Sequence, residues 1–368
     1  MHSYYHSRNE DFNSVNDIVY YYAQEFSKAP RNQDGKEILN PLISLKYPRN
    51  RNLFLRGKEN NPFAAWAELL WMLGGDEYLN PVMTAFIPQC TEFSDDGKTW
   101  HDAYNIRLRK NNSLEHILQM YKEDGINTTR GCCSIWRPDL DACSAVQEDL
   151  DTKTSHAPNA SFIWTFIRNN EFNLKLGMRS NDIFYGMINV FEFTALQEIL
   201  YEYLKRDLYP YLKLGKFIHD PLVLFAQKKN STDLWDISEW QENEELSKYS
   251  HDEDNFKIQI PAKMNLYEFT GQLYRLFESM VRLILDKGKT VNIEAVKEAF
   301  DVFFDRANCP SKFNSLYLYA VLPLAYLSFN RLKNSEDRDN FIDFIKKSGI
   351  ILSIDIEKML QVRYGLSM

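Results

Sequence analysis

Apolar residues recur at helical spacing in several stretches of this chain. FNSVNDIVYYYAQEFSK (12–28), NPFAAWAELLWMLGG (61–75), NSLEHILQMYKEDG (112–125) and MINVFEFTALQEILYEYLKR (187–206) carry the pattern. Spacing of this kind gives a helix one apolar face that can be buried. Each stretch therefore predicts a helix, and the second also has a proline in its first turn and a glycine pair at its end.

Shorter apolar runs between these helices predict strands. GCCSIW (131–136), ASFIWTFIR (160–168), EFNLKLGM (171–178) and KFIHDPLVLFA (216–226) have the composition of strands. The second and third runs flank Asn169-Asn170, which suits a tight hairpin turn. The first part of the chain is thus expected to be α+β, with a sheet backed by helices.

The pattern changes after residue 230. Residues 231–263 are polar and acidic, which is typical of a linker or an exposed excursion. Residues 264–368 return to helical spacing, with about five helices separated by recognisable end signals. We therefore predict a domain over residues 1–230, a linker over 231–263, and an all-helical C-terminal domain over 264–368, which we expect to form a bundle.

Composition and charge exclude several classes of function. The 368 residues are 44% hydrophobic and 26% charged, which is ordinary for a globular protein. No apolar run approaches the length of a membrane span, and the N-terminus lacks the core of a signal peptide. The net charge of −8 argues against general binding to nucleic-acid backbone. The five cysteines are irregularly spaced and predict neither a disulfide framework nor a metal site, which fits a cytoplasmic protein.

Four blocks between residues 60 and 227 carry more specific information through their order. They are FAAWAELLWMLGG, FSDDGKTWHDAYNIRLR, TRGCCSIWRPDLD and PNASFIWTFIRNNEFNLKLGMRSNDIFYG. In this order and spacing the chain resembles the thymidylate synthase and deoxycytidylate/deoxyuridylate hydroxymethylase family, and it is closer to the hydroxymethylase-like branch. The resemblance implies a mixed, twisted sheet with flanking helices, a pyrimidine nucleoside monophosphate as ligand, and a homodimer.

The resemblance implies three catalytic residues. Glu68 falls where the family has a glutamate that relays protons to the pyrimidine ring. Tyr104 matches a tyrosine near the nucleophile, and Asp182 matches an aspartate that contacts the base or orders active-site water. A carboxyl group in an apolar helix can be tuned for acid–base work. Without the other blocks, Glu68 would be interpreted as an interfacial residue at the start of a helix.

The resemblance also implies the groups that hold the nucleotide phosphate. Arg130, Arg179 and Ser180 match phosphate-binding positions, and Arg130 is expected to reach into the site of the partner subunit. A planar, permanently charged guanidinium suits this task. Where the family often has a second arginine beside Arg130, this chain has a threonine. Arg49 or Arg51 is therefore a candidate to supply the phosphate contact of the missing second arginine.

One residue of the next helix is expected to read the base. The family places an asparagine there for uracil and an aspartate for cytosine, and Asn189 is the candidate base-binding residue. When the chain is aligned to the family pattern without a gap, Val190 falls at this position, and Asn189 is the residue before it. A shift of one residue turns a side chain by about 100° around a helix, so Asn189 serves only if the chain has a local deletion.

The pattern departs from the family at the nucleophile. The family has a cysteine after a proline, and its thiolate adds to C6 of the pyrimidine. Here Asn159 follows Pro158, and an amide is not a useful nucleophile. Four other residues are candidates to replace the nucleophile: Cys132, Cys133, Cys143 and His156. For the cysteines, packing as small apolar residues is the favoured interpretation, and for the histidine a loop position without a catalytic role.

Two further departures concern the sugar and the cofactor. Phe225 and Gln227 stand where the family has a histidine and a tyrosine for the ribose hydroxyl, and His219 is near but out of register. No C-terminal segment resembles the one that closes over folate, and the helical region stands in its place. We therefore expect no cofactor, and folate (methylenetetrahydrofolate) only if the family chemistry is retained.

Three functions follow from these observations. The leading expectation is a protein that binds a pyrimidine nucleoside monophosphate without folate-dependent transfer, as a sensor or scaffold whose helical region contacts a protein partner. The alternative is an enzyme that modifies a pyrimidine nucleotide at C5 without the usual cysteine. The third is conventional folate-dependent transfer with a displaced cysteine.

Overall fold

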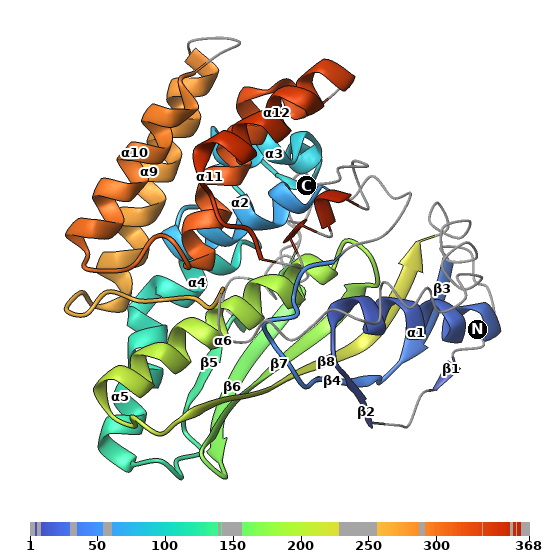
Figure 1. Ribbon diagram of the computed structural model, residues 1–368. Helices are drawn as coiled ribbons and strands as arrows, with labels where there is room; N and C mark the ends of the chain where they lie inside the picture. The colour runs from blue at the N-terminus through green and yellow to red at the C-terminus, as the bar shows by residue number, and fades with distance from the viewer. Residues whose placement is uncertain are drawn as a thin grey trace. The chain divides into compact units, whose positions relative to one another are not determined.

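The computed structural model describes residues 4–5, 9–29, 35–53, 61–138, 141, 157–227, 256–286, 291–332, 334–353, 356–357 and 359–361 (Figure 1). The chain divides into two compact units. We call Met1–Lys58, Asn111–Cys143 and Ala157–His251 the sheet unit, and Glu59–Lys110, Ser144–His156 and Asp252–Met368 the helical unit. Residues 59–110 thus belong to the same unit as the C-terminal helices, and the domain boundaries expected from the sequence stay a prediction.

A mixed eight-stranded sheet organises the sheet unit. Its order is β1-β3-β8-β7-β6-β5, and β4 pairs with both β8 and β2. β7 runs parallel to β8, whereas β6 is antiparallel to β7. The strands are β1 (Tyr4–Tyr5), β2 (Asn9–Phe12), β3 (Gly35–Leu39), β4 (Leu42–Leu45), β5 (Cys132–Ser134), β6 (Ala160–Arg168), β7 (Glu171–Asp182) and β8 (Lys213–Gln227).

The turn between β6 and β7 confirms the predicted hairpin. Asn169 and Asn170 have positive φ angles of 55° and 60°, which is the left-handed pair that a two-residue hairpin turn requires. Arg168 and Glu171 are directly paired across the turn. The hairpin fixes the register of β6 on β7, and this register brings the start of β6 beside the end of β7.

Three α-helices belong to the part of the sheet unit that the structure describes. They are α1 (Val15–Lys28), α5 (Ser113–Asp124) and α6 (Met187–Asp207), and each confirms a helix expected from the sequence. α1 and α6 lie on the same side of the sheet (Figure 1). α6 connects β7 to the parallel strand β8, which is the usual way to join parallel neighbours.

The helical unit is built around α2 (Pro62–Gly74). α2 packs against α9 (Leu266–Asp286) and α11 (Ser315–Ser328), where the rings of Phe63 and Tyr326 stack at 4.5 Å. α2 ends at Gly75, whose φ of 74° is a conformation that glycine adopts without strain. Further helices of the described chain are α3 (Val82–Phe86), η1 (Pro88–Phe93), α4 (Tyr104–Arg109), α10 (Ile293–Arg306), η6 (Asn330–Leu332) and α12 (Ser335–Ser348). η2 (Lys110–Asn112) spans the division of the chain after Lys110.

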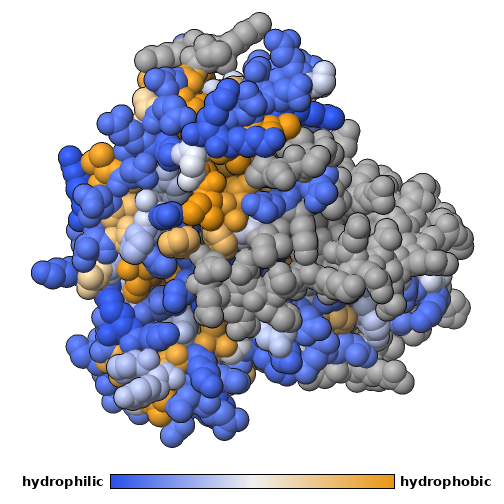
Figure 2. Space-filling model, in the orientation of Figure 1, coloured by the Kyte–Doolittle hydropathy of each residue, from blue (hydrophilic) through white to orange (hydrophobic). Residues whose placement is uncertain are grey.

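The expected fold class is confirmed: a mixed sheet with flanking helices, and an all-helical C-terminal region. Four of the expected C-terminal helices are present, and the fifth, near residues 353–365, falls largely outside the described residues. None of the helices that the structure describes has both the length and the apolar character to cross a bilayer. In the view of Figure 2 the described surface is mostly polar, with apolar side chains gathered in a few places.

Candidate functional site

Arg179 lies near the C-terminal end of β7, beside the start of β6. Its backbone N–H donates to the carbonyl oxygen of Asn159 at 2.8 Å. Its side chain is exposed, with Nε donating to Pro158 O at 3.2 Å and Nη2 to Ala157 O at 2.8 Å. Nη1 has no partner among the residues that the structure describes. These bonds hold the guanidinium in place and leave donors that an anion can use.

Ser180 and Asn159 meet at the same end of the hairpin. Ser180 Oγ donates to Asn159 Oδ1 at 3.1 Å, and both residues are partly exposed. The structure therefore brings together Arg179, Ser180 and Asn159, three of the residues singled out from the sequence. Their roles in phosphate binding and at the nucleophile position stay predictions.

Asp182 orders the turn that leads from β7 into α6. Its Oδ1 accepts the backbone N–H groups of Phe184 at 2.8 Å and Tyr185 at 2.9 Å. An aspartate commonly stabilises a turn in this way. The observed contacts give Asp182 a structural task, and its expected contact with the base stays a prediction.

Asn189 belongs to a chain of side-chain hydrogen bonds that starts in the first turn of α6. Asn189 Nδ2 donates to Asn181 Oδ1 at 3.1 Å. Asn181 Nδ2 lies 3.0 Å from Gly186 O and 3.0 Å from Nε2 of His219 on β8. Asn181 and His219 are both 1% exposed, whereas Asn189 is partly exposed. The chain therefore runs from the interior of the sheet unit to a partly exposed amide, and we call it the amide cluster.

His219 is neutral in this cluster. Burial lowers its pKa to about 3, since a charged imidazole is costly away from water. The family resemblance puts His219 near the sugar site but out of register, and it gives no role to Asn181. Asn181 lies in the fourth quoted block, between Ser180 and Asp182, and its polarity next to an apolar strand was the available signal.

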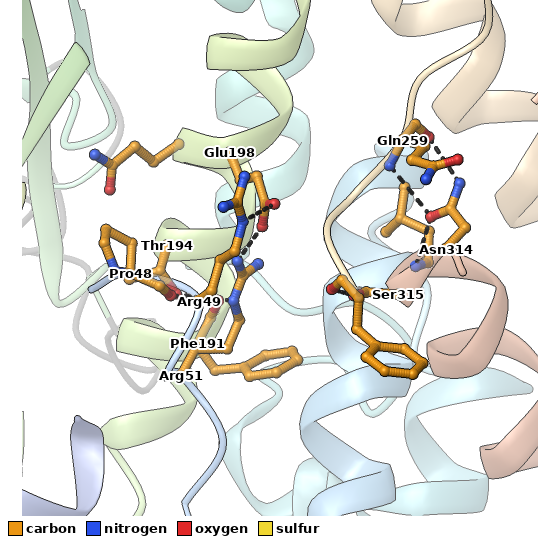
Figure 3. A network of polar contacts seen from close by, with 12 residues as sticks. Pro48, Arg49, Arg51, Phe191, Thr194, Glu198, Gln259, Asn314 and Ser315 are labelled. Carbon is orange, nitrogen blue, oxygen red and sulfur yellow. Dashed lines mark hydrogen bonds and ion pairs between the residues drawn. The ribbon is translucent and has the colours of Figure 1, made fainter. Parts of the chain in front are cut away.

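Arg49 and Arg51, weighed as further phosphate ligands, converge instead on Glu198 in the middle of α6 (Figure 3). Arg49 Nε lies 2.6 Å from Glu198 Oε1, and Arg51 binds Oε2. The side chains of Arg51 and Glu198 are 2% and 1% exposed. Both carboxylate oxygens are thus engaged within the protein. We call these three residues the ion cluster. Arg51 Nη1 is buried and has no hydrogen-bond partner among the described residues, and a phosphate role for the two arginines stays a prediction.

Arg130 is exposed near the end of α5, where it pairs with an acid of its own unit. Its side chain is 64% exposed, and its Nε donates to Asp124 Oδ2 at 2.6 Å. This hydrogen bond and the negative charge of Asp124 raise the pKa of Arg130. Its expected reach into a partner subunit stays a prediction.

Glu68 and Tyr104 belong to the helical unit. Glu68 is on α2 and partly buried, and Tyr104 begins α4. Burial raises the pKa of Glu68, and the nearby carboxylate of Asp102 raises it further. A raised pKa suits a general acid near neutral pH. The sequence analysis missed Asp102, which lies in the quoted block two residues before Tyr104.

The described cysteines differ in exposure. Cys132 is exposed and Cys133 is buried, which confirms that their strand turns them to opposite faces. Burial raises the pKa of Cys133, of Cys90 to about 11 and of Cys309 to about 12, so these thiols are poor sources of thiolate. Cys143 and His156 lie outside the described residues.

Phe225 and Gln227, expected at the ribose position, lie at the end of β8. Phe225 pairs with Asp182 on β7, and Gln227 pairs with Gly35 on β3. The pairing brings Phe225 to the strand end that carries Arg179 and Ser180. Neither residue reproduces the hydroxyl-binding pair that the resemblance implies.

A separate cavity of about 640 Å³ lies within the helical unit. None of the predicted site residues lines it. Within the part of the chain that the structure describes, no group of three or more His, Cys, Asp or Glu residues is arranged to hold a metal ion. The charged residues that line the cavity are Asp76, Lys98, Arg109, Arg275, Glu278 and Arg282.

Comparison with known proteins finds relatives among phage enzymes. No protein-family model matches the chain. Deoxyuridylate hydroxymethyltransferase of Delftia phage PhiW-14 is 33% identical over 179 residues, which is 48% of this chain and 50% of that protein. The enzyme of the same name from Bacillus phage SP01 is 27% identical over 206 residues, 52% of this chain and 51% of its own. That of Pseudomonas phage M6 is 32% identical over 157 residues, 41% of this chain and 42% of its own.

The chain spans about half the length of the phage proteins it matches. Among solved structures, a thermostable thymidylate synthase A from Bacillus subtilis has a TM-score of 0.45 and 17% identity, covering 63% of this chain and 78% of its own. The phage relatives support the family resemblance that the four sequence blocks suggest. Their shared name describes a transferase, which agrees better with an enzyme than with a protein that only binds nucleotide.

Proposed function

We propose that this chain is an enzyme that modifies a pyrimidine nucleoside monophosphate at C5, in the class of hydroxymethyl transfer to deoxyuridylate. Its similarity to three deoxyuridylate hydroxymethyltransferases supports the reaction class. The observation that carries the proposal is the group of Arg179, Ser180 and Asn159 at the end of β7. The expectation of a binding protein without transfer activity gains no support from these relatives.

In this proposal the nucleotide phosphate binds at the end of β7. Arg179 supplies guanidinium donors that its bonds to Ala157 and Pro158 leave unused. Ser180 supplies a hydroxyl that now donates to Asn159 and can turn to a phosphate oxygen. The proposal assigns the edge of the base to the Asn189 amide, as the resemblance implies.

Proton transfer is assigned to the carboxyl groups. Glu68 has a raised pKa and is therefore suited to carry a proton to or from the pyrimidine ring near neutral pH. For Asp182 and Tyr104 the proposal takes over the roles that the resemblance implies, at the base and near the nucleophile. Activation at C5 needs electron density there, which family chemistry supplies by adding a nucleophile at C6.

Asn159 favours a second candidate function, nucleotide binding without transfer. Its amide oxygen accepts the hydroxyl of Ser180 and offers no nucleophile. Three of the described cysteines have raised pKa values through burial, so among the described thiols Cys132 is the exposed one. If no other group adds to C6, the site would bind the nucleotide and stop there.

A one-carbon donor is needed for transfer, and methylenetetrahydrofolate is the donor that the resemblance implies. Half of the twelve residues that line the cavity of the helical unit are charged, and none of the twelve is a predicted site residue, so nothing assigns a folate to this cavity. No step is therefore derived through a folate.

A homodimer is part of the proposal. The face of β6 that carries Phe162 and Trp164 has their rings 4.4 Å apart, and Trp164 is 45% exposed. Exposed aromatic pairs on a sheet are typical of an association surface. Arg130, exposed on the same unit, would then serve the partner's phosphate site. A protein partner for the C-terminal helical region stays a prediction.

Release of tritium from C5-labelled deoxyuridylate and deoxycytidylate tests the reaction, because exchange at C5 requires activation of that carbon. We expect exchange with wild type, and loss of exchange after Arg179→Ala. Binding measured by calorimetry without any exchange would favour the second candidate function. If Asn159→Cys then acquires exchange, residue 159 stands at the nucleophile position.

A further inference from the structure

The polarity of the amide cluster can be assigned from its buried end. Gly186 O is a carbonyl oxygen and can only accept, so the Asn181 atom 3.0 Å away must be the amide nitrogen. Asn181 Oδ1 therefore faces Asn189, and Asn189 must donate to it through Nδ2. The orientation of two side-chain amides thus follows from one backbone carbonyl.

His219 completes the same assignment. The second N–H of Asn181 Nδ2 points to His219 Nε2 at 3.0 Å, so this ring nitrogen accepts. The proton is then on Nδ1, which is buried and has no hydrogen-bond partner among the described residues. An imidazolium could not accept this bond, and burial keeps the ring neutral. If Asn181 flipped its amide, its oxygen would face Gly186 O, and His219 would have to carry its proton on Nε2 to keep a bond to Asn181.

The packing around Asn181 allows little other movement. A Cβ on Gly186 would lie 2.0 Å from Asn181 Oδ1 and 2.4 Å from Asp182 O. Only a glycine leaves the room that the side chain of Asn181 occupies. Asn181 is therefore held by shape as well as by its hydrogen bonds.

The fixed polarity decides what Asn189 presents to a ligand. With one N–H given to Asn181, its amide keeps Oδ1 and a second N–H. Uracil offers a donor at N3 and an acceptor at O4, whereas cytosine offers an acceptor at N3 and a donor at N4. The two bases present the same pair in opposite order, so a flip of one amide exchanges the preferred base.

We propose that Asn181 and His219 are specificity-determining positioning residues, which hold the Asn189 amide in the single orientation that selects uracil over cytosine. This inference rests on the proposed function, in which Asn189 faces the base. Neither residue touches the nucleotide in this arrangement, and both act through Asn189. A buried histidine on β8 thereby contributes to the choice of substrate.

Calorimetry with deoxyuridylate and deoxycytidylate tests the proposal on wild type and four variants. We expect wild type to bind deoxyuridylate at least about tenfold more tightly, as for a base edge read by two hydrogen bonds. Asn181→Ala and His219→Phe should bring the ratio of the two affinities toward one, since Asn189 can then turn. His219→Gln should keep most of it, because a glutamine oxygen can accept from Asn181.

Gln197→Leu is the matched control. Gln197 is another buried amide of α6, but it donates to Phe172 O and Lys216 O and has no bond to the amide cluster. Its loss should lower stability and leave the affinity ratio unchanged. A general loosening of α6 would move the ratio in this variant too, and that result would count against the proposal.

Failure of the inference can be told from failure of the proposed function. If wild type binds neither nucleotide, both are wrong. If it binds both equally, or if Asn181→Ala keeps the ratio, the inference alone is wrong. Nitrogen NMR of 15N-histidine-labelled wild type adds a readout on the unaltered protein, with the His219 signal assigned as the one lost in His219→Gln. A proton on Nε2 of His219 would overturn the assignment.

Discussion

Two polar clusters meet the helix α6, and they differ in charge and in where they end. The amide cluster of Asn189, Asn181 and His219 is neutral and runs outward to a partly exposed amide. The ion cluster pairs Glu198 with two arginines, and both of its carboxylate oxygens are occupied inside the protein. The amide cluster thus ends at an amide that water or a ligand can reach, whereas the carboxylate of the ion cluster has both oxygens bound by arginines.

The difference shows how one helix can serve both stability and recognition. Charges buried without water need each other, so the ion cluster ties α6 to the segment after β4. Neutral amides lose less when one partner is replaced, so the amide cluster can present unused groups at its outer end. Arg49 and Arg51, which the sequence offered as candidate phosphate ligands, both pair with Glu198 in the ion cluster.

Glu198→Ala should have the largest effect of the variants that separate the clusters. Burial alone would raise the pKa of Glu198, but Arg49 and Arg51 outweigh it and lower the pKa. Removing the carboxylate leaves Arg51 buried without its counter-charge, at a cost of about 3–5 kcal/mol. Urea denaturation measures the loss, with Glu198→Gln as the variant that keeps shape and one acceptor. A loss under about 1 kcal/mol would show that the arginines find other partners.

The amide cluster should respond to acid, because His219 is buried neutral. Its pKa is near its ordinary value of about 6.5 when unfolded and about 3 when folded. Between these values the unfolded state binds the extra proton, so stability is full above pH about 6.5 and falls toward pH 3, by up to about 1.4 kcal/mol per pH unit. Urea denaturation from pH 7.5 to 4.5 measures the slope. His219→Gln should be less steep, and equal slopes would mean that His219 titrates normally.

Sequence patterns predicted the parts of this architecture that depend on near neighbours. The hairpin at Asn169-Asn170 and the ends of α2 follow from residues within one turn. The strand predicted from the sequence ends at Met178, because polar residues follow it. In the structure β7 continues to Asp182, because β8 pairs with it to that point. Tertiary pairing here overrides the local pattern.

The site was predicted in part for the same reason. Arg179, Ser180 and Asn159 come together because the register of one hairpin is enough to align them. The contact of Asn181 with His219 joins residues 38 apart, and that of Arg51 with Glu198 joins residues 147 apart. Such contacts depend on the packing of a whole sheet and helix, which no spacing in the sequence expresses.

Gly186→Ala should damage the amide cluster without touching its polar groups. The new methyl would overlap Asn181 Oδ1 and the backbone of Asp182, so either the strand end or the helix start must shift. Overpacking of this kind costs about 1–3 kcal/mol. Thermal denaturation measures it, and the ratio of the two nucleotide affinities should fall as well.

Gly271→Ala is the matched control for that substitution. Gly271 lies inside α9, and an added Cβ there would meet its nearest neighbour, Arg109 Nη2, at 3.4 Å, which is an ordinary contact. Alanine should stabilise this helix by about 0.5–1 kcal/mol. If both variants lose the same stability, a glycine replacement as such is harmful and the space around Asn181 is not the cause.

Arg130→Ala should have the smallest effect on stability, because its pair with Asp124 is exposed and screened by solvent and salt. We expect an unfolding midpoint indistinguishable from wild type, in contrast to Glu198→Ala. Nucleotide affinity measured by calorimetry then separates two roles for this arginine. If Arg130 serves a partner's phosphate, affinity falls and the protein is a dimer in light scattering. An unchanged affinity would leave Arg130 as a surface ion pair, and Arg179 would then be the arginine on which the phosphate site depends.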